Sequence, residues 1–114
     1  YVGWSAGSMI FARDLGRWPD AFDDEDELAM FGLAEAAPAV PLFDWFFAGH
    51  LGADWMPQTA EAWASRGAAR TGREVWFVDD DTALVVRDPA AEPIVVSMGH
   101  WRRFGVDGSL VASA

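Results

Sequence analysis

Residues 3–7 read Gly-Trp-Ser-Ala-Gly, and this short stretch decides which fold the rest of the chain is expected to adopt. The Gly-x-Ser-x-Gly spacing is typical of a sharp turn from a strand into a helix, where the glycines let the backbone bend and the serine hydroxyl is exposed. The alternative is that Ser5 is only a small residue in a glycine-bearing turn. The neighbouring segments and the other candidate site residues are needed to choose between the two.

The segments around this turn have the pattern of an α/β protein. Residues 1–4 resemble the end of a buried strand, and residues 6–15 predict a helix that Gly16 and Pro19 end. A second helix is predicted over 59–69, with Thr59 as its cap and glycines near its end. Short β-rich runs at 74–78, 83–87 and 93–98 predict a terminal β-meander, and residues 106–108 add a last turn.

A strand that leads into such a turn normally lies inside a parallel sheet and needs a neighbour on each edge. No segment before Tyr1 supplies one, so we expect this chain to be the C-terminal part of a longer α/β domain. The missing N-terminal half, or a twin subunit, is then an expected partner. Seven tryptophans allow an exposed aromatic patch where that partner docks.

Composition excludes several classes of function. The chain has 114 residues, is 52% hydrophobic and carries a formal charge of −10, with arginine as its only cationic residue type. This charge argues against binding to nucleic acid or an anionic membrane, and the apolar runs are too short to span a bilayer. The acidic run at 23–27 lacks the pattern of a calcium loop. The absence of cysteine fits a cytoplasmic protein, and we expect no metal or cofactor.

A nucleophilic serine needs a base, a group that orients the base, and donors for the oxyanion. Only two histidines can serve as the base, and His50, in Ala-Gly-His-Leu-Gly after an apolar run, is a better candidate than His100. The orienting acid stays open between Asp20 and the acids of residues 79–81. The backbone N–H of Ala6 is the expected first oxyanion donor.

The second oxyanion donor is usually an N–H on an earlier strand–helix loop, which is expected to lie in the missing half. Losing one donor typically lowers the rate by about a hundredfold or more. We therefore expect this chain by itself to be a poor enzyme.

The stretches GWSAGS at 3–8, PLFDWFFAGH at 41–50 and VDDDTALVV at 78–86, together with Asp20, resemble peptidase E, the aspartyl dipeptidases. That family consists of serine peptidases with a fold like the class I glutamine amidotransferases, a flavodoxin-like three-layer sandwich, and cyanophycinase is a relative. The resemblance covers nearly the whole chain and makes residues 1–114 the C-terminal part of one peptidase E-like domain.

The resemblance implies that Ser5 is the nucleophile and His50 the catalytic histidine. The orienting acid is Asp20 or Asp80; Asp20 ranks slightly higher because Asp80 is one methylene shorter than the glutamate that relatives have there. The resemblance also implies dipeptide substrates with an N-terminal aspartate, which Arg13, Arg17 or Arg66 would bind. The sequence departs from the family at Ala48-Gly49-His50, where an Asn-Pro-His context is usual.

The leading hypothesis is therefore a serine peptidase that hydrolyses small peptides through an acyl-enzyme on Ser5. The alternative is a non-catalytic amidotransferase-like domain that binds a partner or a small ligand. An esterase or lipase of the α/β-hydrolase type fits less well, because those enzymes place the acid and the histidine after several further βα units.

Overall fold

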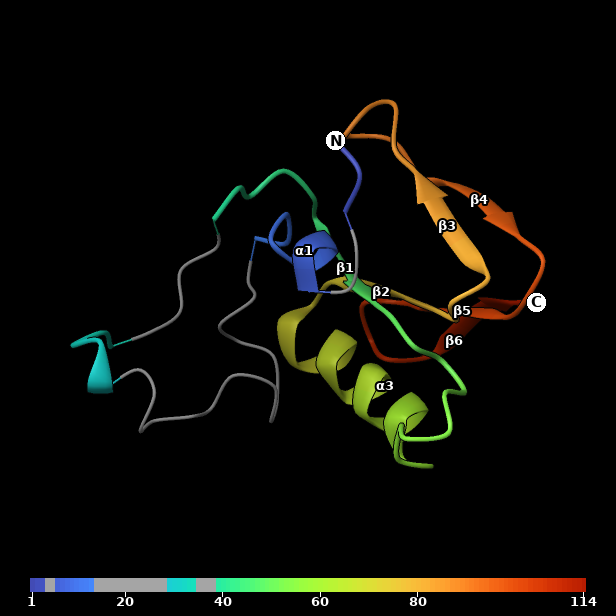
Figure 1. The fold of residues 1–114 in the computed structure, drawn as a ribbon, viewed down its shortest axis with the longest axis horizontal. Coiled ribbons are helices and arrows are strands. Elements are labelled where there is room, and N and C mark those ends of the chain that lie inside the picture. Colours follow the sequence, from blue (N-terminus) through green and yellow to red (C-terminus); the bar gives the residue numbers. More distant parts are fainter. Residues whose placement is uncertain (4–5, 14–28, 35–38) are drawn as a thin grey trace.

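The computed structural model describes residues 1–3, 6–13, 29–34 and 39–114 and has mixed α/β architecture (Figure 1). Within these residues the structure contains the helices α1 (Ala6–Met9) and α3 (Ala60–Thr71). The strands are β1 (Trp45–Ala48), β2 (Glu74–Val78), β3 (Thr82–Val85), β4 (Ile94–Ser97), β5 (Trp101–Phe104) and β6 (Leu110–Ser113). In these ranges no helix has the length and apolar character that crossing a membrane requires.

The main sheet has the strand order β1-β2-β5-β6. Strand β1 pairs with β2 in parallel, with Phe46 opposite Val75, and α3 connects the two strands. Strand β2 is buried along four of its five residues, as expected for a continuous apolar strand with a neighbour on each edge. Its other edge pairs antiparallel with β5, and β5 pairs antiparallel with β6. The two parallel strands therefore end at the same edge of the sheet.

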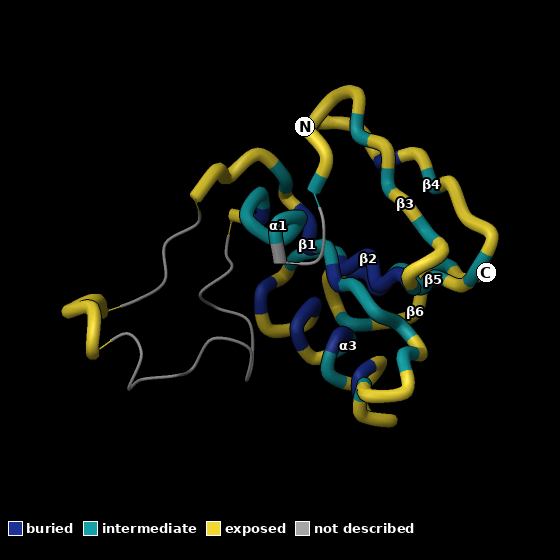
Figure 2. The backbone as a smooth tube through the Cα atoms, in the orientation of Figure 1, coloured by how far each residue is buried: buried dark blue, intermediate teal, exposed yellow. Residues whose placement is uncertain are grey.

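Small residues let α3 lie close to the sheet. Ala60, Ala64 and Ala68 recur at every fourth position and are all buried, so they form one apolar face of the helix. Figure 2 shows this buried face turned toward β2. The hydrophobic core around it also contains Phe46, Val75, Phe77 and Phe104.

The predicted helix over 59–69 is confirmed, although it runs on to Thr71. Gly67 is buried inside the helix, and the helix ends at Gly72, which is left-handed with φ 65° and donates its N–H to the carbonyl of Ala68. Thr59 occupies the N-cap position, but its side chain makes no capping hydrogen bond.

The predicted helix over 6–15 is wrong beyond Met9. Residues 10–13 form a turn and a bridge, in which Ala12 pairs in parallel with Phe43 just before β1. Ala12 is only 2% exposed, so the chain gains burial and strand pairing there that a longer helix would forgo. The expected helix residues 14 and 15 lie outside the described residues.

The terminal strands do not form one continuous meander, which corrects the prediction. Strands β3 and β4 form a separate two-stranded sheet, and β2 pairs with β5 instead of with the next strand along the chain. The physical reason is burial: β5 places the buried Phe104 opposite Val75, whereas β3 exposes every second residue.

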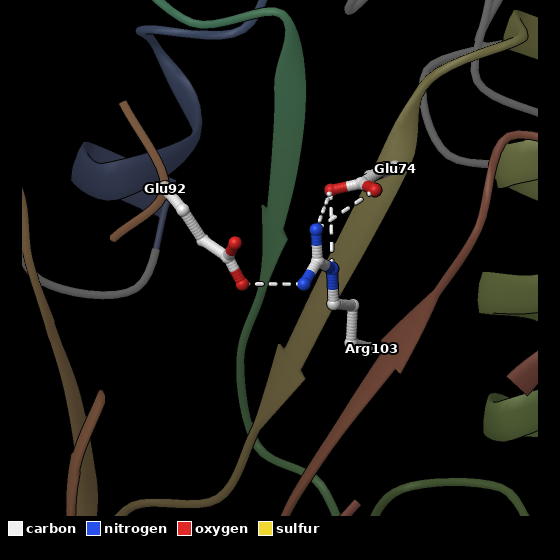
Figure 3. Close-up of polar contacts among 3 residues, drawn as sticks. All are labelled: Glu74, Glu92 and Arg103. Atoms are coloured by element: carbon white, nitrogen blue, oxygen red, sulfur yellow. Dashed lines mark hydrogen bonds and ion pairs between the residues drawn. The ribbon is translucent and has the colours of Figure 1, made fainter. Parts of the chain in front are cut away.

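Arg103 and two glutamates link the β3–β4 hairpin to the main sheet (Figure 3). Arg103 on β5 donates to both carboxylate oxygens of Glu74 on β2, each at 3.0 Å, and also to Glu92, just before β4. Its guanidinium lies 4.8 Å from the ring centre of Trp76. Charge-assisted hydrogen bonds between an arginine and a carboxylate are stronger than those between neutral groups. Through Glu92, Arg103 attaches the hairpin to the strands that carry the candidate site.

Candidate active site

His50 lies just beyond β1, at the edge where the parallel strands end. Its φ is 67°, and among the described residues it alone has a positive φ without being glycine. Such a backbone costs a bulky residue about 1–3 kcal/mol and is often found at functional sites. The next residue, Leu51, donates its N–H to the carbonyl of Val78 at 3.0 Å, which ties this turn to the end of β2.

Asp80 meets His50 at this edge. Strand β2 ends at Val78, and the Asp80 Oδ1 atom lies 2.8 Å from His50 Nδ1. The histidine side chain is 28% exposed and the aspartate 71% exposed, so the pair faces solvent from the aspartate side. A neutral imidazole that donates Nδ1–H to a carboxylate keeps Nε2 as its basic nitrogen.

The aromatic ring of Trp55 is the second neighbour of His50. The two ring centres are 5.0 Å apart and the planes are tilted by 58°, although Trp55 itself is 68% exposed. Sequence analysis did not select Trp55. The only signal for it was an aromatic residue shortly after the candidate base, and that pattern is too common to be specific.

Asp79, directly before Asp80, makes a different set of contacts. Its carboxylate accepts hydrogen bonds from the Thr82 hydroxyl at 2.7 Å, the Asp81 N–H at 3.2 Å and the His100 N–H. Partial burial raises the pKa of Asp79, but the hydrogen bonds from Thr82, His100 and Asp81 outweigh it and hold that pKa below its usual value. Asp79 is therefore an ionised acceptor at neutral pH.

The structure describes the residues on both sides of Trp4 and Ser5. At Gly3 a Cβ atom would lie 2.8 Å from Ser8 Oγ and 3.0 Å from Ser8 Cα, so only glycine fits without a shift. The Tyr1 hydroxyl donates to the carbonyl of Gly7 at 3.0 Å. Residues 1–3 therefore lie directly against helix α1, which begins at Ala6. The predicted end of a buried strand over 1–4 is wrong for these three residues, which form no strand, and Tyr1 and Val2 are exposed.

Three of the residues selected from the sequence, Ser5, Arg17 and Asp20, lie outside the described residues. Of the expected cationic side chains, Arg13 forms an ion pair with Asp44, with its Nε 2.8 Å from the carboxylate. Asp44 directly precedes β1, so Arg13 lies at the opposite end of that strand from His50. Arg66 is exposed on α3.

A shallow hollow of about 300 Å³ adjoins the loop that follows His50. Its walls come from that loop and the first turn of α3, including Leu51, Asp54, Met56 and Glu61. Glu61 also lies 3.5 Å from Arg102 Nε. Over the part of the chain that the structure describes, no three His, Asp or Glu side chains gather as metal ligands.

Comparison with models of protein families gives a match. A family model described as peptidase family S51 matches residues 1–94, well over half of the 114 residues. The matched range contains Ser5, His50 and Asp80. No curated protein and no solved structure matches the chain.

Proposed function

The chain belongs to peptidase family S51, and from this premise we propose that it is a serine peptidase that cleaves small peptides through an acyl-enzyme on Ser5. The observation that carries the proposal is the contact of 2.8 Å between His50 Nδ1 and Asp80 Oδ1, made from a left-handed backbone at the end of β1. A base with an orienting carboxylate is what a serine nucleophile requires.

In the proposed reaction His50 Nε2 accepts the hydroxyl proton while Ser5 Oγ attacks the carbonyl carbon of the peptide. The tetrahedral intermediate collapses, the C–N bond breaks, and the same imidazole gives its proton to the leaving amine. Water then attacks the ester with His50 again as base, which releases the acid and restores the serine. The Ala6 N–H, at the start of α1, is the proposed donor to the oxyanion.

We assign the orienting role to Asp80 in preference to Asp20. The side chain of Asp80 is shorter than that of a glutamate. It reaches His50 because β1 and β2 are parallel neighbours and both residues follow the ends of those strands. Asp20 lies outside the described residues and remains a prediction. The assignment predicts that Asp80→Asn, which leaves the wrong imidazole tautomer favoured, has a larger effect on kcat than Asp20→Asn.

The close packing of Gly3 on Ser8 supports a nucleophile elbow at Ser5, because the elbow needs the segments before and after its serine to approach closely. The finer points of the proposal are an amidotransferase-like three-layer sandwich, a cytoplasmic location and a preference for dipeptides with N-terminal aspartate. The last has the weakest support, since Arg13 is paired with Asp44 away from His50.

The test is labelling of the protein with a fluorophosphonate probe, followed by mapping of the adduct by mass spectrometry. We expect the adduct on Ser5, with its loss in Ser5→Ala and a rate lowered by at least about a hundredfold in His50→Gln. Ser113→Ala on β6 is the matched control and should keep full labelling. An unlabelled Ser5 in the folded protein, with the expected N-terminal half also present, would overturn the proposal and favour the non-catalytic binding domain.

A further inference from the structure

The carboxylate of Asp80 has little of its own to hold it in place. Its side chain is 71% exposed, and within the described residues its one side-chain hydrogen bond is to His50. An exposed ion pair typically contributes only about 0–1 kcal/mol, because ordering the side chains offsets most of the attraction. The position of Asp80 must therefore be set by the backbone of the turn that carries it.

That turn is held by its first residue, Asp79. One carboxylate oxygen of Asp79 accepts from the Asp81 N–H and the Thr82 hydroxyl, which closes the turn around Asp80. The other accepts from the N–H of His100, the residue just before β5. A backbone hydrogen bond also joins Asp79 to His100, since the Asp79 N–H donates to the His100 carbonyl at 3.0 Å.

Two neighbours complete the attachment. The Thr82 hydroxyl also lies 2.6 Å from Ser97 Oγ, which joins the turn to the end of β4. At Gly99 any Cβ atom would overlap the Asp79 carboxylate, so glycine is what leaves room for that carboxylate to reach the His100 N–H. The Asp79 side chain therefore connects the turn to β3 and to the residue before β5, and the Thr82 hydroxyl connects it to β4.

We propose that Asp79 is a positioning residue that holds Asp80 within hydrogen-bond distance of His50, so that the two adjacent aspartates have different roles. Asp80 orients the imidazole, and Asp79 fixes the turn. This inference rests on the proposed function for its effect on turnover, but the geometry that it explains, the contact between Asp80 and His50, is independent of any activity.

The test compares Asp79→Asn with Asp80→Asn and with a matched control. Asp107→Asn is the control because Asp107 closes the β5–β6 turn by accepting from the N–H and hydroxyl of Ser109, at the other end of β5. A misplacement of about 1 Å costs roughly a hundredfold in rate. We expect Asp79→Asn to lower kcat about 10- to 100-fold with little change in KM, and Asp107→Asn to leave both within about twofold.

A second readout does not require activity. The Nδ1 proton of a histidine bonded to a carboxylate resonates far downfield in NMR spectra, and we expect that signal of His50 in the wild type and in Asp107→Asn. It should disappear in Asp80→Asn and weaken or disappear in Asp79→Asn. An unchanged signal in Asp79→Asn would overturn the positioning role, whether or not Ser5 is a nucleophile.

Rescue at Thr82 separates positioning from a general loss of structure. Thr82→Val removes the hydroxyl that binds Asp79, and Thr82→Ser keeps it. We expect Thr82→Val to weaken the downfield signal and lower kcat. Thr82→Ser should keep both the signal and kcat near their wild-type values. If Ser5 proves unreactive but the signal follows this pattern, the proposed function fails and the positioning role stands; equal signals in the two Thr82 variants would contradict the positioning role.

Discussion

The interior of the β1–α3–β2 unit and the edge where its two strands end differ in burial and polarity. The interior is apolar and closed, with Phe46 and Phe77 at most 1% exposed and alanines packed beneath the sheet. The edge is polar and half-open, and it has a strained backbone at His50 and an exposed carboxylate at Asp80. The interior brings the two strand ends together, while the edge carries the groups that can do chemistry. Substitutions in the two regions should therefore separate stability from turnover.

The largest effect is expected at the edge, with His50→Gly. We expect kcat to fall by about a thousandfold or more, because the proposed base is lost. The free energy of unfolding should change by less than about 1 kcal/mol, because glycine relieves the left-handed backbone while the contacts to Asp80 and Trp55 disappear. Steady-state kinetics and urea unfolding of the same sample measure both. A loss of several kcal/mol would mean that the edge supports the core.

The reverse is expected for Phe77→Ala in the interior. Phe77 is fully buried on β2, and a phenylalanine-to-alanine truncation in a core typically costs about 3–5 kcal/mol of unfolding free energy. Turnover per folded molecule should stay near that of the wild type, provided that β1 and β2 remain paired. Chemical denaturation gives the stability, and active-site titration corrects the rate for the folded fraction. A large fall in kcat per folded molecule would show that the two regions are coupled.

Asp79 lies at the border of the two regions and should link stability to pH. Its pKa is lowered in the folded protein, so it contributes stability above about pH 4, the usual pKa of a free aspartate, and loses it as the pH falls through the lower folded-state value. We expect the stability difference between wild type and Asp79→Asn to be constant from about pH 7 to 5 and to shrink below about pH 4. Urea unfolding across this range measures it. If the stability difference is as large at about pH 2 as at neutral pH, the ionised carboxylate of Asp79 is not its source.

The smallest effect is expected at Gly72, at the end of α3. A Cβ atom there meets nothing within 4 Å, so Gly72→Ala should cost only the left-handed conformation, about 1 kcal/mol. Thermal unfolding would detect this as a small fall in Tm, with kcat unchanged. A cost of about 3 kcal/mol or more would indicate that the connection from α3 to β2 has a tighter role in holding the sheet.

The elements that sequence analysis predicted well are those in which local chemistry and burial agree. The apolar run at 74–78 is strand β2 with the predicted bounds, and the alanine-rich segment after Thr59 is α3. Two predictions failed where a distant partner decided the local structure. Ala12 pairs with Phe43 instead of extending a helix, and β5 replaces β3 beside β2. No local pattern contains that information.

The sequence by itself determined the peptidase family, through the glycine-serine turn and the stretches that match the family model over residues 1–94. It also selected His50, because only two histidines were available. It left Asp20 and Asp80 open, because spacing along the chain cannot rank 18 carboxylates by their distance from one imidazole. Only the tertiary structure brought Asp80 to 2.8 Å from a residue 30 positions away and gave Asp79 a separate set of hydrogen-bond donors. The physical reason is that parallel pairing of β1 and β2 places both strand ends at one edge, and pairing partners are chosen by burial of the whole sheet.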